Sequence, residues 1–499
     1  MNQPVRKIVV AGRSALAWIA ASGLMRALRH RNLEVWVVDT GVDESPVGHW
    51  TLPSQRGMHA LLNINEADFM VRTGATFRLA TRHVGWQGDG SAFLHAHGDI
   101  GSEIGGTPFY RYLQGEARAG RPVHPEAYSL AGFAALLGRF ARPMGKDLTA
   151  SFTYGFHVEA NAYATYLRLH AERLGVRKAP AGLANVRMAP GGEIAALQLS
   201  DGSELVADLY IDCSGSAGRL ATQALPAPRE DWSAWLPCDR ILSVLGMEIP
   251  DPAAITQTVA GDAGWSWRSP FSKASMAGVV YCSAFQSDES ARATLAKIEP
   301  NMLAEPLLTR IAAGRRRVCW QHNCVALGSA ALELEPLAGA TLHYGQVGLA
   351  TLVELFPLNR ESTVEAAEFN RLMAEQGDAL RDFTLAHYRA GRGRTGEFWN
   401  GLRSVPLPAR LAHKLDLYAA SGRIQMLDHE TFEETDWAWL LMGSGCVPAA
   451  TELQIKDQLT RLSPRDLDAM RAQVHQVAAT MPPHAEFVRR QASAPPRPR

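Results

Sequence analysis

The sequence predicts an α/β fold that begins with a strand–helix–strand unit and ends in a helical C-terminal half. Residues 8–11 form a short apolar run of strand length, and apolar residues then recur at helical spacing from position 16 to position 28. A second apolar strand follows at residues 35–38. From residue 363 onward, apolar side chains again recur at helical spacing and predict amphipathic helices. The order strand, helix, strand is typical of a parallel sheet that binds a nucleotide.

The turn after the first strand resembles a dinucleotide-binding loop. In the pattern G-x-G-x-x-G, residues 12–17 read GRSALA, so Gly12 keeps the tight turn while Ser14 and Ala17 replace the other two glycines. Asp39 directly follows the second strand, where an acid hydrogen-bonds a ribose hydroxyl. The Ser14 side chain stands where the backbone must approach pyrophosphate, so we expect a dinucleotide to bind with weakened affinity. The alternative is a Rossmann-like scaffold that has lost its nucleotide.

Composition excludes several classes of partner. The 499 residues are 46% hydrophobic and 20% charged, with 50 Lys and Arg against 50 Asp and Glu. Such a chain can bury a sizeable core, and its balanced charge gives no field that draws it to nucleic acid or an anionic membrane. It contains no apolar run of transmembrane length and no signal peptide, so we expect a cytoplasmic protein. The six cysteines lack the spacing of zinc or redox sites, so we expect them to be reduced.

A family resemblance rests on short motifs in a fixed order. Residues 264–270 read GWSWRSP, with Trp265 and Trp267 two positions apart, and this run resembles the W-x-W-x-I-P signature of flavin-dependent tryptophan halogenases. The resemblance implies a catalytic role for both tryptophans, although by themselves they are equally typical of one face of a buried strand. Further similar segments follow the family order: residues 66–70, 74–77, 154–159, 323–328, 334–337, 387–388, 398–399 and 443–448. The chain is therefore identified as a member of this family from about residue 7 to residue 448.

The resemblance implies the fold and the cofactor. We expect a Rossmann-like, FAD-binding flavin-monooxygenase fold, called the box, with a helical C-terminal substrate region, called the pyramid. The corresponding division is an FAD-binding domain with substrate-facing inserts at residues 1–350, a helical region at 351–485 and a disordered tail at 486–499. FAD would be used in its reduced form, supplied by a separate flavin reductase.

Cofactor-binding positions follow from the same resemblance. Residues 45–53 are similar to the family's G-V-G-E-A-T-I-P strap along the flavin, with Gly48 retained. His49 and Trp50 replace the glutamate and the alanine of that strap and should crowd or reshape the flavin pocket. Three further positions complete the expected cofactor site. Asp212 and Gly215 lie in a run similar to the strand and glycine turn of flavin monooxygenases, and Gly328 lies in the run that resembles the one leading to the family's catalytic glutamate.

The positions that carry catalysis in the family are changed in this chain. The resemblance implies that reduced FAD, oxygen and a halide generate hypohalous acid, which a lysine captures while a neighbouring glutamate assists proton loss from the substrate ring. Arg78 stands at the lysine position. Residues 337–341 read LAGAT in place of L-E-S-T, so Ala338 holds the glutamate position and Gly339 that of the halide-side serine. A guanidinium stays charged and is a poor nucleophile, although its donors can hold an anion.

Substrate contacts are expected from His95, His97 and Trp437. His95 and His97 have metal-ligand spacing on a strand and align with the family's H-P-F-G loop, but with no third ligand in view we expect no metal. Trp437 can stack on an aromatic ring. Its alternative is core packing together with Trp439, at positions i and i+2.

Two main hypotheses follow for function. The first is a tryptophan-halogenase-like flavin-dependent oxidoreductase or monooxygenase for an indole or another aromatic, small or peptide-borne, with altered or impaired activity. The second is an inactive pseudo-halogenase that serves as a binding or regulatory partner, in a hetero-oligomer with an active halogenase; a homo-oligomer is also open. An NAD(P)H-dependent flavin hydroxylase is disfavoured, because such enzymes do not combine the W-x-W and L-E-P-L motifs.

Overall fold

The chain folds into two compact units, each assembled from three stretches of sequence. The computed structural model describes residues 4–41, 47–143, 148–357, 359, 363–391, 393–450, 455 and 462–493. Unit 1 comprises Met1–Gly74, Val158–Asp239 and Thr309–Asp378, and unit 2 comprises Ala75–His157, Arg240–Leu308 and Ala379–Arg499. The division expected at residue 350 follows chain order and differs from this interleaved arrangement.

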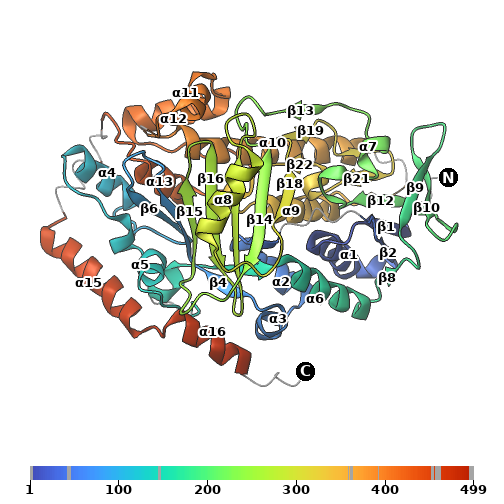
Figure 1. The fold of residues 1–499 in the computed structure, drawn as a ribbon, viewed down its shortest axis with the longest axis horizontal. Coiled ribbons are helices and arrows are strands. Elements are labelled where there is room, and N and C mark those ends of the chain that lie inside the picture. The colour runs from blue at the N-terminus through green and yellow to red at the C-terminus, as the bar shows by residue number, and fades with distance from the viewer. Residues whose placement is uncertain are drawn as a thin grey trace. The chain divides into compact units, whose positions relative to one another are not determined.

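Unit 1 is built on a six-stranded sheet in the order β20-β21-β12-β1-β2-β8 (Figure 1). Its first strand pairs in parallel with β2 on one side and β12 on the other, which confirms the predicted strand–helix–strand opening. The strands are β1 (Lys7–Ala11), β2 (Glu34–Val38), β8 (Arg177–Lys178), β12 (Leu209–Asp212), β20 (Trp320–Gln321) and β21 (Cys324–Ala326). All of β1 after Lys7 is buried, as a parallel sheet covered by helices requires.

Helices cover this sheet, and small sheets complete the unit. Gly23 of α1 lies so close to α9 that an added Cβ would stand 2.7 Å from Leu349 Cδ2. The helices of unit 1 are α1 (Ala15–Ala27), α2 (Ser54–Leu62), α3 (Glu66–Thr73), α6 (Ala160–Arg173), α7 (Ala221–Ala224), α9 (Thr341–Glu354) and the first part of α10 (Thr363–Arg389). Its other strands are β3 (Gly48–Trp50), β9 (Leu183–Met188), β10 (Ile194–Leu199), β11 (Glu204–Leu205), β13 (Arg229–Asp231), β19 (Gly314–Arg316) and β22 (Leu332–Glu333).

Unit 2 is organised around a seven-stranded sheet in the order β18-β14-β17-β16-β15-β5-β6. Every residue of β17 is buried, and helix α8 packs its Ala291 and Leu295 against a cluster that includes Leu242 and Tyr281. The strands are β5 (Ala80–Val84), β6 (Ala92–Ala96), β14 (Arg240–Gly246), β15 (Ile255–Ala260), β16 (Gly264–Pro270), β17 (Ser275–Tyr281) and β18 (Leu307–Arg310). A separate antiparallel pair joins β4 (Thr76–Arg78) to β7 (Gly155–Glu159).

The helical C-terminal half that the sequence predicts is present. Helix α10 crosses from unit 1 into unit 2, and the remaining helices of unit 2 are α4 (Tyr110–Arg118), α5 (Leu130–Leu136), α8 (Asp288–Ile298), α11 (Glu397–Ser404), α12 (Ala409–Ser421), α13 (Glu434–Gly443), α15 (Pro464–Thr480) and α16 (His484–Ser493). The tail expected from residue 486 is therefore helical as far as Ser493, because Ala485 and Val488 are buried. Residues 494–499 lie outside the described part of the chain.

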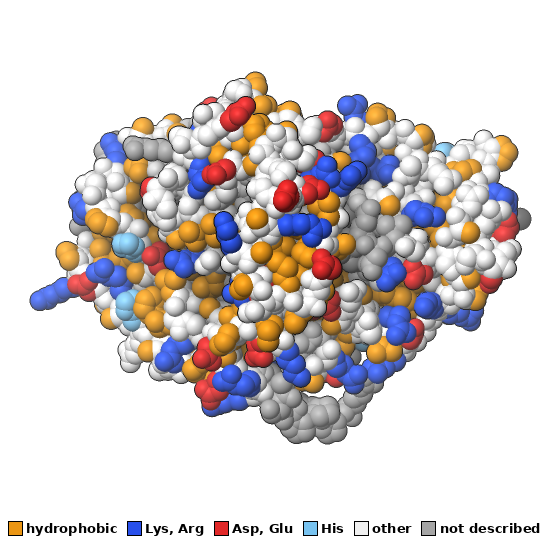
Figure 2. All heavy atoms as spheres, in the orientation of Figure 1, with side chains coloured by type: hydrophobic (Ala, Val, Ile, Leu, Met, Phe, Trp, Pro, Cys, Tyr) orange, Lys and Arg blue, Asp and Glu red, His pale blue; other side chains and the backbone are white. Residues whose placement is uncertain are grey.

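Short 3-10 turns complete the architecture: η1 (Arg29–Arg31), η2 (Pro125–Tyr128), η3 (Leu148–Ser151), η4 (Gly215–Ala217), η5 (Gly328–Ala330) and η6 (Pro336–Ala338). None of the helices among the described residues is long and apolar enough to span a membrane. On the face drawn in Figure 2, basic and acidic side chains are interspersed, without a large patch of either sign. This distribution agrees with the balanced charge of the sequence.

Candidate functional site

The turn after β1 leaves room for a nucleotide backbone. Gly12 has φ +150°, and a Cβ there would lie 2.5 Å from the carbonyl oxygen of Cys213. Its amide donates to Val38 O at 2.9 Å, which ties the turn to β2. Only glycine fits this position, as the motif predicts. Ala17 is fully buried, and its methyl lies 3.2 Å from that added Cβ, so the third-glycine position carries a side chain without disturbing the turn.

The N-terminus of α1 has the character of an anion site. Ser14 is the N-cap, its side chain makes no capping hydrogen bond, and the first turn contains no acidic residue. The positive end of the helix dipole is therefore not neutralised from within, which favours a phosphate. Asp39 follows β2 and accepts a hydrogen bond from the amide of Gly41 at 2.9 Å through Oδ1, which leaves Oδ2 for a ribose hydroxyl. These residues fit the dinucleotide end of FAD.

Asp212 has a structural role that the sequence did not indicate. Its carboxylate accepts hydrogen bonds from the amides of Ser214, Leu220 and Ala221 at 2.8–2.9 Å and from the Ser214 hydroxyl at 2.6 Å. Both oxygens are thereby engaged in holding the turn after β12. The turn itself contains Gly215 at φ +75°. Asp212 therefore shapes this loop from within and has its acceptors occupied.

The strap at residues 45–53 and the loop at residues 337–341 meet in unit 1. Trp50 is 4% exposed, and a Cβ on Gly339 would lie 2.6 Å from its Cδ1 atom and 2.8 Å from its carbonyl oxygen. Gly339 also has φ +67°, and Ala338 before it closes turn η6. The Trp50 side chain, which was expected to crowd the flavin pocket, thus fills the space beside Gly339. Gly48 is buried in β3, Gly328 begins η5, and Ser45 and Pro46 of the strap lie outside the described residues.

Arg78 is a buried cation in unit 2. It ends β4 and is 3% exposed. Its Nη1 donates to His97 Nε2 at 2.9 Å, and its Nη2 donates to Thr81 Oγ1 at 2.6 Å. Burial lowers the pKa of Arg78 to about 9, with Asp436 opposing that shift. Burial and the charge of Arg78 keep the pKa of His97 well below its usual value, so the imidazole is neutral and accepts the hydrogen bond.

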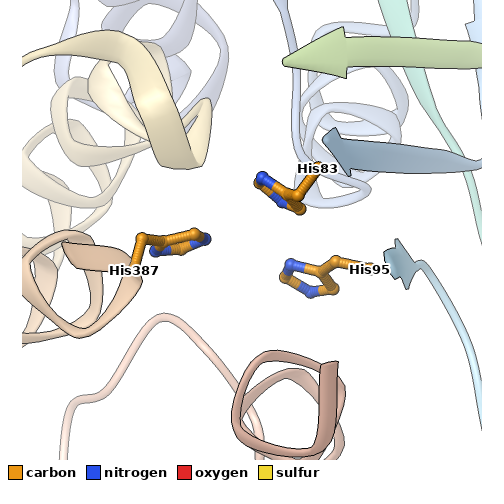
Figure 3. Close-up of side chains that lie close together, drawn as sticks. All are labelled: His83, His95 and His387. Carbon is orange, nitrogen blue, oxygen red and sulfur yellow. The ribbon is translucent and has the colours of Figure 1, made fainter. Parts of the chain in front are cut away.

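His95 and His97 point to different partners although they lie two residues apart. His95 sits on β6, where its Nε2 lies 2.8 Å from Asp436 Oδ1. One ring nitrogen of His95 also lies within 4.8 Å of ring nitrogens of His83 and His387 (Figure 3). His97 instead pairs with Arg78. The sequence pointed to His95 and His97 as the histidine pair, but the structure groups His95 with two residues that were not considered.

The predicted aromatic residues are packed in the core of unit 2. Trp437 is 1% exposed, its indole N–H donates to Glu430 at 3.0 Å, and the amine of Lys414 lies 4.3 Å from its ring centroid. Trp439 is equally buried and donates to Gly98 O at 3.4 Å. Both lie on helix α13, where positions i and i+2 face different directions. Both tryptophans are therefore buried, on two faces of one helix, and the substrate contact expected of Trp437 stays a prediction.

Trp265 and Trp267 lie on β16 and contact each other. Their ring centroids are 5.6 Å apart, and both side chains are buried. Gly278 pairs with Trp267 across to β17, and a Cβ at Gly278 would fall 2.1 Å from the Trp267 ring. The W-x-W motif thus forms one packed face of the seven-stranded sheet, and Gly278 opposite makes room for the Trp267 ring.

Proteins similar to this chain are halogenases. The profile of the family described as Tryptophan halogenase matches residues 7–458. The tryptophan 7-halogenase RebH of Lentzea aerocolonigenes is 27% identical over 531 residues, covering 98% of this chain and 99% of that protein. The tryptophan 7-halogenase KtzQ of a Kutzneria strain is 29% identical over 444 residues, with 85% of this chain and 83% of that protein covered.

Solved structures give the same result. A flavin-dependent halogenase from Brevundimonas superposes with a TM-score of 0.91 at 32% identity, covering 98% of this chain and 99% of that one. A flavin-dependent halogenase from Xanthomonas campestris superposes with a TM-score of 0.92 at 33% identity, covering 99% of this chain and 100% of that one. The predicted box-and-pyramid fold is therefore confirmed.

Proposed function

This chain belongs to the tryptophan halogenase family, and on that premise we propose that it is a flavin-dependent enzyme for an aromatic substrate whose halogen-transfer step is altered. The observation that carries the proposal is Arg78, a buried guanidinium at the position of the family's lysine. When bound, reduced FAD supplies the oxidising chemistry together with oxygen. The residues of this chain decide what happens to the oxidised halogen species afterwards.

Arg78 can hold an anion but is poorly suited to covalent capture. Even with its pKa lowered to about 9, the side chain is almost fully protonated at neutral pH, and its charge is delocalised over the guanidinium. Two of its nitrogens already donate to His97 and Thr81, which fixes its orientation. A lysine amine, by contrast, has a lone pair once deprotonated. We therefore expect Arg78 to orient a hypohalous acid or another small anion by hydrogen bonding rather than to form a haloamine.

The loss of the acid at position 338 supports the same proposal. Ala338 offers no proton acceptor, and Gly339 offers no hydroxyl. General acid–base groups commonly contribute about 10²–10⁴-fold to a rate. We infer that free tryptophan, which needs both groups in the family's reaction, is not the substrate that this chain halogenates efficiently. An aromatic with a more reactive carbon free, such as the unsubstituted C3 of indole or a carbon of pyrrole, places less demand on both positions.

Weakened FAD affinity is part of the proposal. Gly12, the open N-terminus of α1 and Asp39 support binding of the dinucleotide, whereas Ser14 adds a side chain at the N-cap. Titration of FAD, followed by quenching of its fluorescence, should show saturable binding to the unmodified protein and tighter binding to Ser14→Gly. The substitution Ser287→Gly, at the N-cap of α8 in unit 2, serves as the control and should leave the FAD affinity unchanged.

The need for a reductase, the oligomeric state and the cytoplasmic location stay predictions.

Activity is tested with FAD, a flavin reductase, NADH and bromide, using L-tryptophan and indole as separate substrates and mass spectrometry as the readout. The unmodified protein should give no brominated tryptophan. Restoring Arg78→Lys alone should recover little, because the lysine and the glutamate act on one transition state. Recovery of tryptophan bromination should need Arg78→Lys combined with Ala338→Glu and Gly339→Ser. Trp50→Ala is added to this variant, since Trp50 fills the space beside position 339. Brominated tryptophan from the unmodified protein would overturn the altered role of Arg78.

A second candidate function is the inactive pseudo-halogenase. The observation that favours it is the packing of Trp50 against Gly339, because it joins two substitutions, one in the flavin strap and one at the halide-side serine, into a single filled space. The FAD titration discriminates between the candidates. Saturable FAD binding supports the flavin-dependent enzyme, and absence of binding at high FAD supports the pseudo-halogenase.

A further inference from the structure

Three buried histidines of unit 2 direct ring nitrogens toward one another. One ligand atom from each of His83, His95 and His387 lies within 4.8 Å of the other two, and Figure 3 shows the three rings converging. Their exposed fractions are 1%, 7% and 5%. The sequence showed only His95 as a ligand candidate, because His83 and His387 lie far from each other along the chain.

The sheet register brings the first two together. Strands β5 and β6 pair antiparallel with Thr81 opposite His95 and His83 opposite Phe93. His83 follows Thr81 by two residues, so it shares a face with Thr81 and with His95 and is a diagonal neighbour of His95. The third histidine, His387, comes from the last turn of α10. Residues from two strands and one helix thus meet on one face of the sheet.

Each ring is oriented by a hydrogen bond on its outer nitrogen. His95 Nε2 lies 2.8 Å from the Asp436 carboxylate, and His387 Nδ1 lies 2.9 Å from the carbonyl oxygen of Phe383. His83 Nδ1 lies 2.9 Å from the hydroxyl of Thr258, its partner on β15. In metal sites, the histidine ligands donate their second N–H to a carboxylate, a backbone carbonyl or a similar acceptor, which fixes tautomer and orientation. All three histidines have an outer partner of this kind.

The inner nitrogens are left as buried acceptors. His83 Nε2 is fully buried and has no hydrogen-bond partner among the described residues. Burial lowers the pKa of His387 to about 3 and that of His83 well below its usual value, with neighbouring charges adding to the effect on His83. This keeps the lone pairs of the His83 and His387 rings available. A buried polar atom without a partner costs free energy, so a cation or a water molecule in this space would remove that cost.

We propose that His83, His95 and His387 bind one divalent transition-metal ion, with Zn²⁺ as the reference, and leave one coordination position open for water or another ligand. Three neutral imidazoles suit Zn²⁺, Cu²⁺, Ni²⁺ or Fe²⁺ and are unsuited to Mg²⁺ or Ca²⁺, which prefer oxygen. Three histidines with an open fourth position are the ligand set of a catalytic rather than a closed structural zinc site. The proposal goes beyond the flavin function and does not depend on FAD binding.

The geometry needs only small adjustments of the side chains. With metal–nitrogen bonds of about 2.0–2.1 Å in a tetrahedral site, the ligand nitrogens lie about 3.3 Å apart. Contraction from separations of up to 4.8 Å is within reach of small rotations of the three rings. Trp86, Phe93 and Phe383 surround the histidines with aromatic contacts, which keeps the environment apolar.

Two charged groups nearby act in opposite directions. Arg78 is close enough to depress the pKa of His83, and its charge opposes a cation at the histidines. Asp436 is close enough to raise the pKa of Arg78 and also contacts His95 directly, so its carboxylate offsets that repulsion. The carboxylate therefore has two roles in the proposed site: it orients His95, and it compensates the charge of Arg78.

The test uses untagged full-length protein, stripped with a chelator and then titrated with Co²⁺, in the absence of FAD. The expected result is one Co²⁺ per chain with the visible absorption of a tetrahedral ion, displaced by Zn²⁺. His387→Phe, which keeps an aromatic ring among its neighbours, and His95→Asn, which keeps a donor toward Asp436, should each weaken binding by more than about a hundredfold. Asp436→Asn should weaken it by about 10–100-fold, as loss of an outer partner does.

The control is His124→Gln, which removes an exposed imidazole that faces Glu126. It should bind Co²⁺ like the unmodified protein. Circular dichroism identifies which variants are folded, and the two ligand variants are independent, so failure of one to fold leaves the other as a test. Absence of tight Co²⁺ and Zn²⁺ binding to the folded protein, retained affinity in a folded ligand variant, or loss of affinity in His124→Gln would each overturn the site. The first outcome would mean that these imidazoles hold water only.

Discussion

The indole ring of Trp50 occupies the space that any side chain at position 339 needs. The two residues lie almost 300 positions apart in the sequence, yet in unit 1 they form one packing unit. A large residue at position 50 and a glycine at position 339 fit each other in volume, as close-packed interiors require. At the scale of single residues, the side chains allowed at positions 50 and 339 therefore depend on each other.

Gly339→Ser should therefore destabilise unit 1, and Trp50→Ala should relieve the effect. The serine must adopt φ +67°, which costs about 1–2 kcal/mol, and its Cβ would overlap the indole ring, which adds about 1–3 kcal/mol. In the background Trp50→Ala, the overlap with the indole ring is removed, and the costs of φ +67° and of the 2.8 Å approach to the carbonyl oxygen of residue 50 should remain. A double-mutant cycle of urea unfolding free energies measures the difference. Additive effects of the two substitutions would contradict the coupling of positions 50 and 339.

Sequence reasoning singled out residues that belong to a motif and missed residues that only the fold brings together. Gly12, Asp39, Arg78 and His95 were proposed because each belongs to a short motif or follows a predicted strand. His83 and His387 were missed as ligands because their approach depends on the β5–β6 register and on where α10 ends, which spacing along the chain does not encode. Asp212 was proposed as a cofactor-binding residue, whereas the structure shows its carboxylate accepting four hydrogen bonds from the loop after β12.

At the scale of elements, the contact between α1 and α9 shows how the nucleotide turn is supported. Leu16 of α1 lies against α9, where an added Cβ on Gly345 would stand 2.5 Å from its Cδ2. About two helical turns after Leu16, Gly23 of α1 lies against Leu349 of α9. Because α1 begins directly after the nucleotide turn, this tight packing fixes the direction in which its N-terminus points. The sequence predicted α1 and its apolar face, but not which helix would cover it.

Gly23→Ala tests this contact, with Gly57→Ala as a matched control. Both glycines lie inside helices, where alanine is intrinsically favoured by about 0.8–1.0 kcal/mol. At Gly57 an added Cβ meets nothing within 4 Å, so the variant should be more stable by up to that amount. At Gly23 the Cβ would meet Leu349 at 2.7 Å, and overpacking of about 1–3 kcal/mol should outweigh the gain. Thermal unfolding of both variants gives the comparison, and equal stabilisation of the two would show that α1 and α9 are not in close contact.

At the scale of the whole molecule, the fold is shared with a structural relative although most residues differ. A TM-score of 0.91 at 32% identity with the Brevundimonas halogenase shows that most of the architecture tolerates substitution. The family could be predicted from the sequence because motifs such as W-x-W are packed features of the core, and packing constrains residue type. The interleaved units could not be predicted, because each is assembled from three separate stretches of chain.

Both units bury neutral histidines, and this predicts a loss of stability in mild acid. Burial lowers the pKa of His59 in unit 1 to about 3 and that of His484 in unit 2 to about 4. The unfolded chain has histidine pKa values near 6.5, so between about pH 6.5 and pH 4 it binds protons that the folded chain does not. The stabilisation is therefore complete above about pH 6.5 and is lost as the pH falls, by about 1.4 kcal/mol per pH unit for each such histidine.

The substitution His484→Asn isolates one of these groups. His484 Nδ1 lies 2.6 Å from the carbonyl oxygen of Pro252, and an asparagine amide can donate the same hydrogen bond without titrating. Urea unfolding between about pH 7.5 and pH 4.5, followed by tryptophan fluorescence, should show below about pH 6 a slope for His484→Asn that is smaller by up to about 1.4 kcal/mol per pH unit. The exposed His124, changed to glutamine, should leave the slope as it is. An unchanged slope in His484→Asn would mean that His484 is already protonated in the folded chain, because only a group that differs in charge between the two states contributes to the pH dependence.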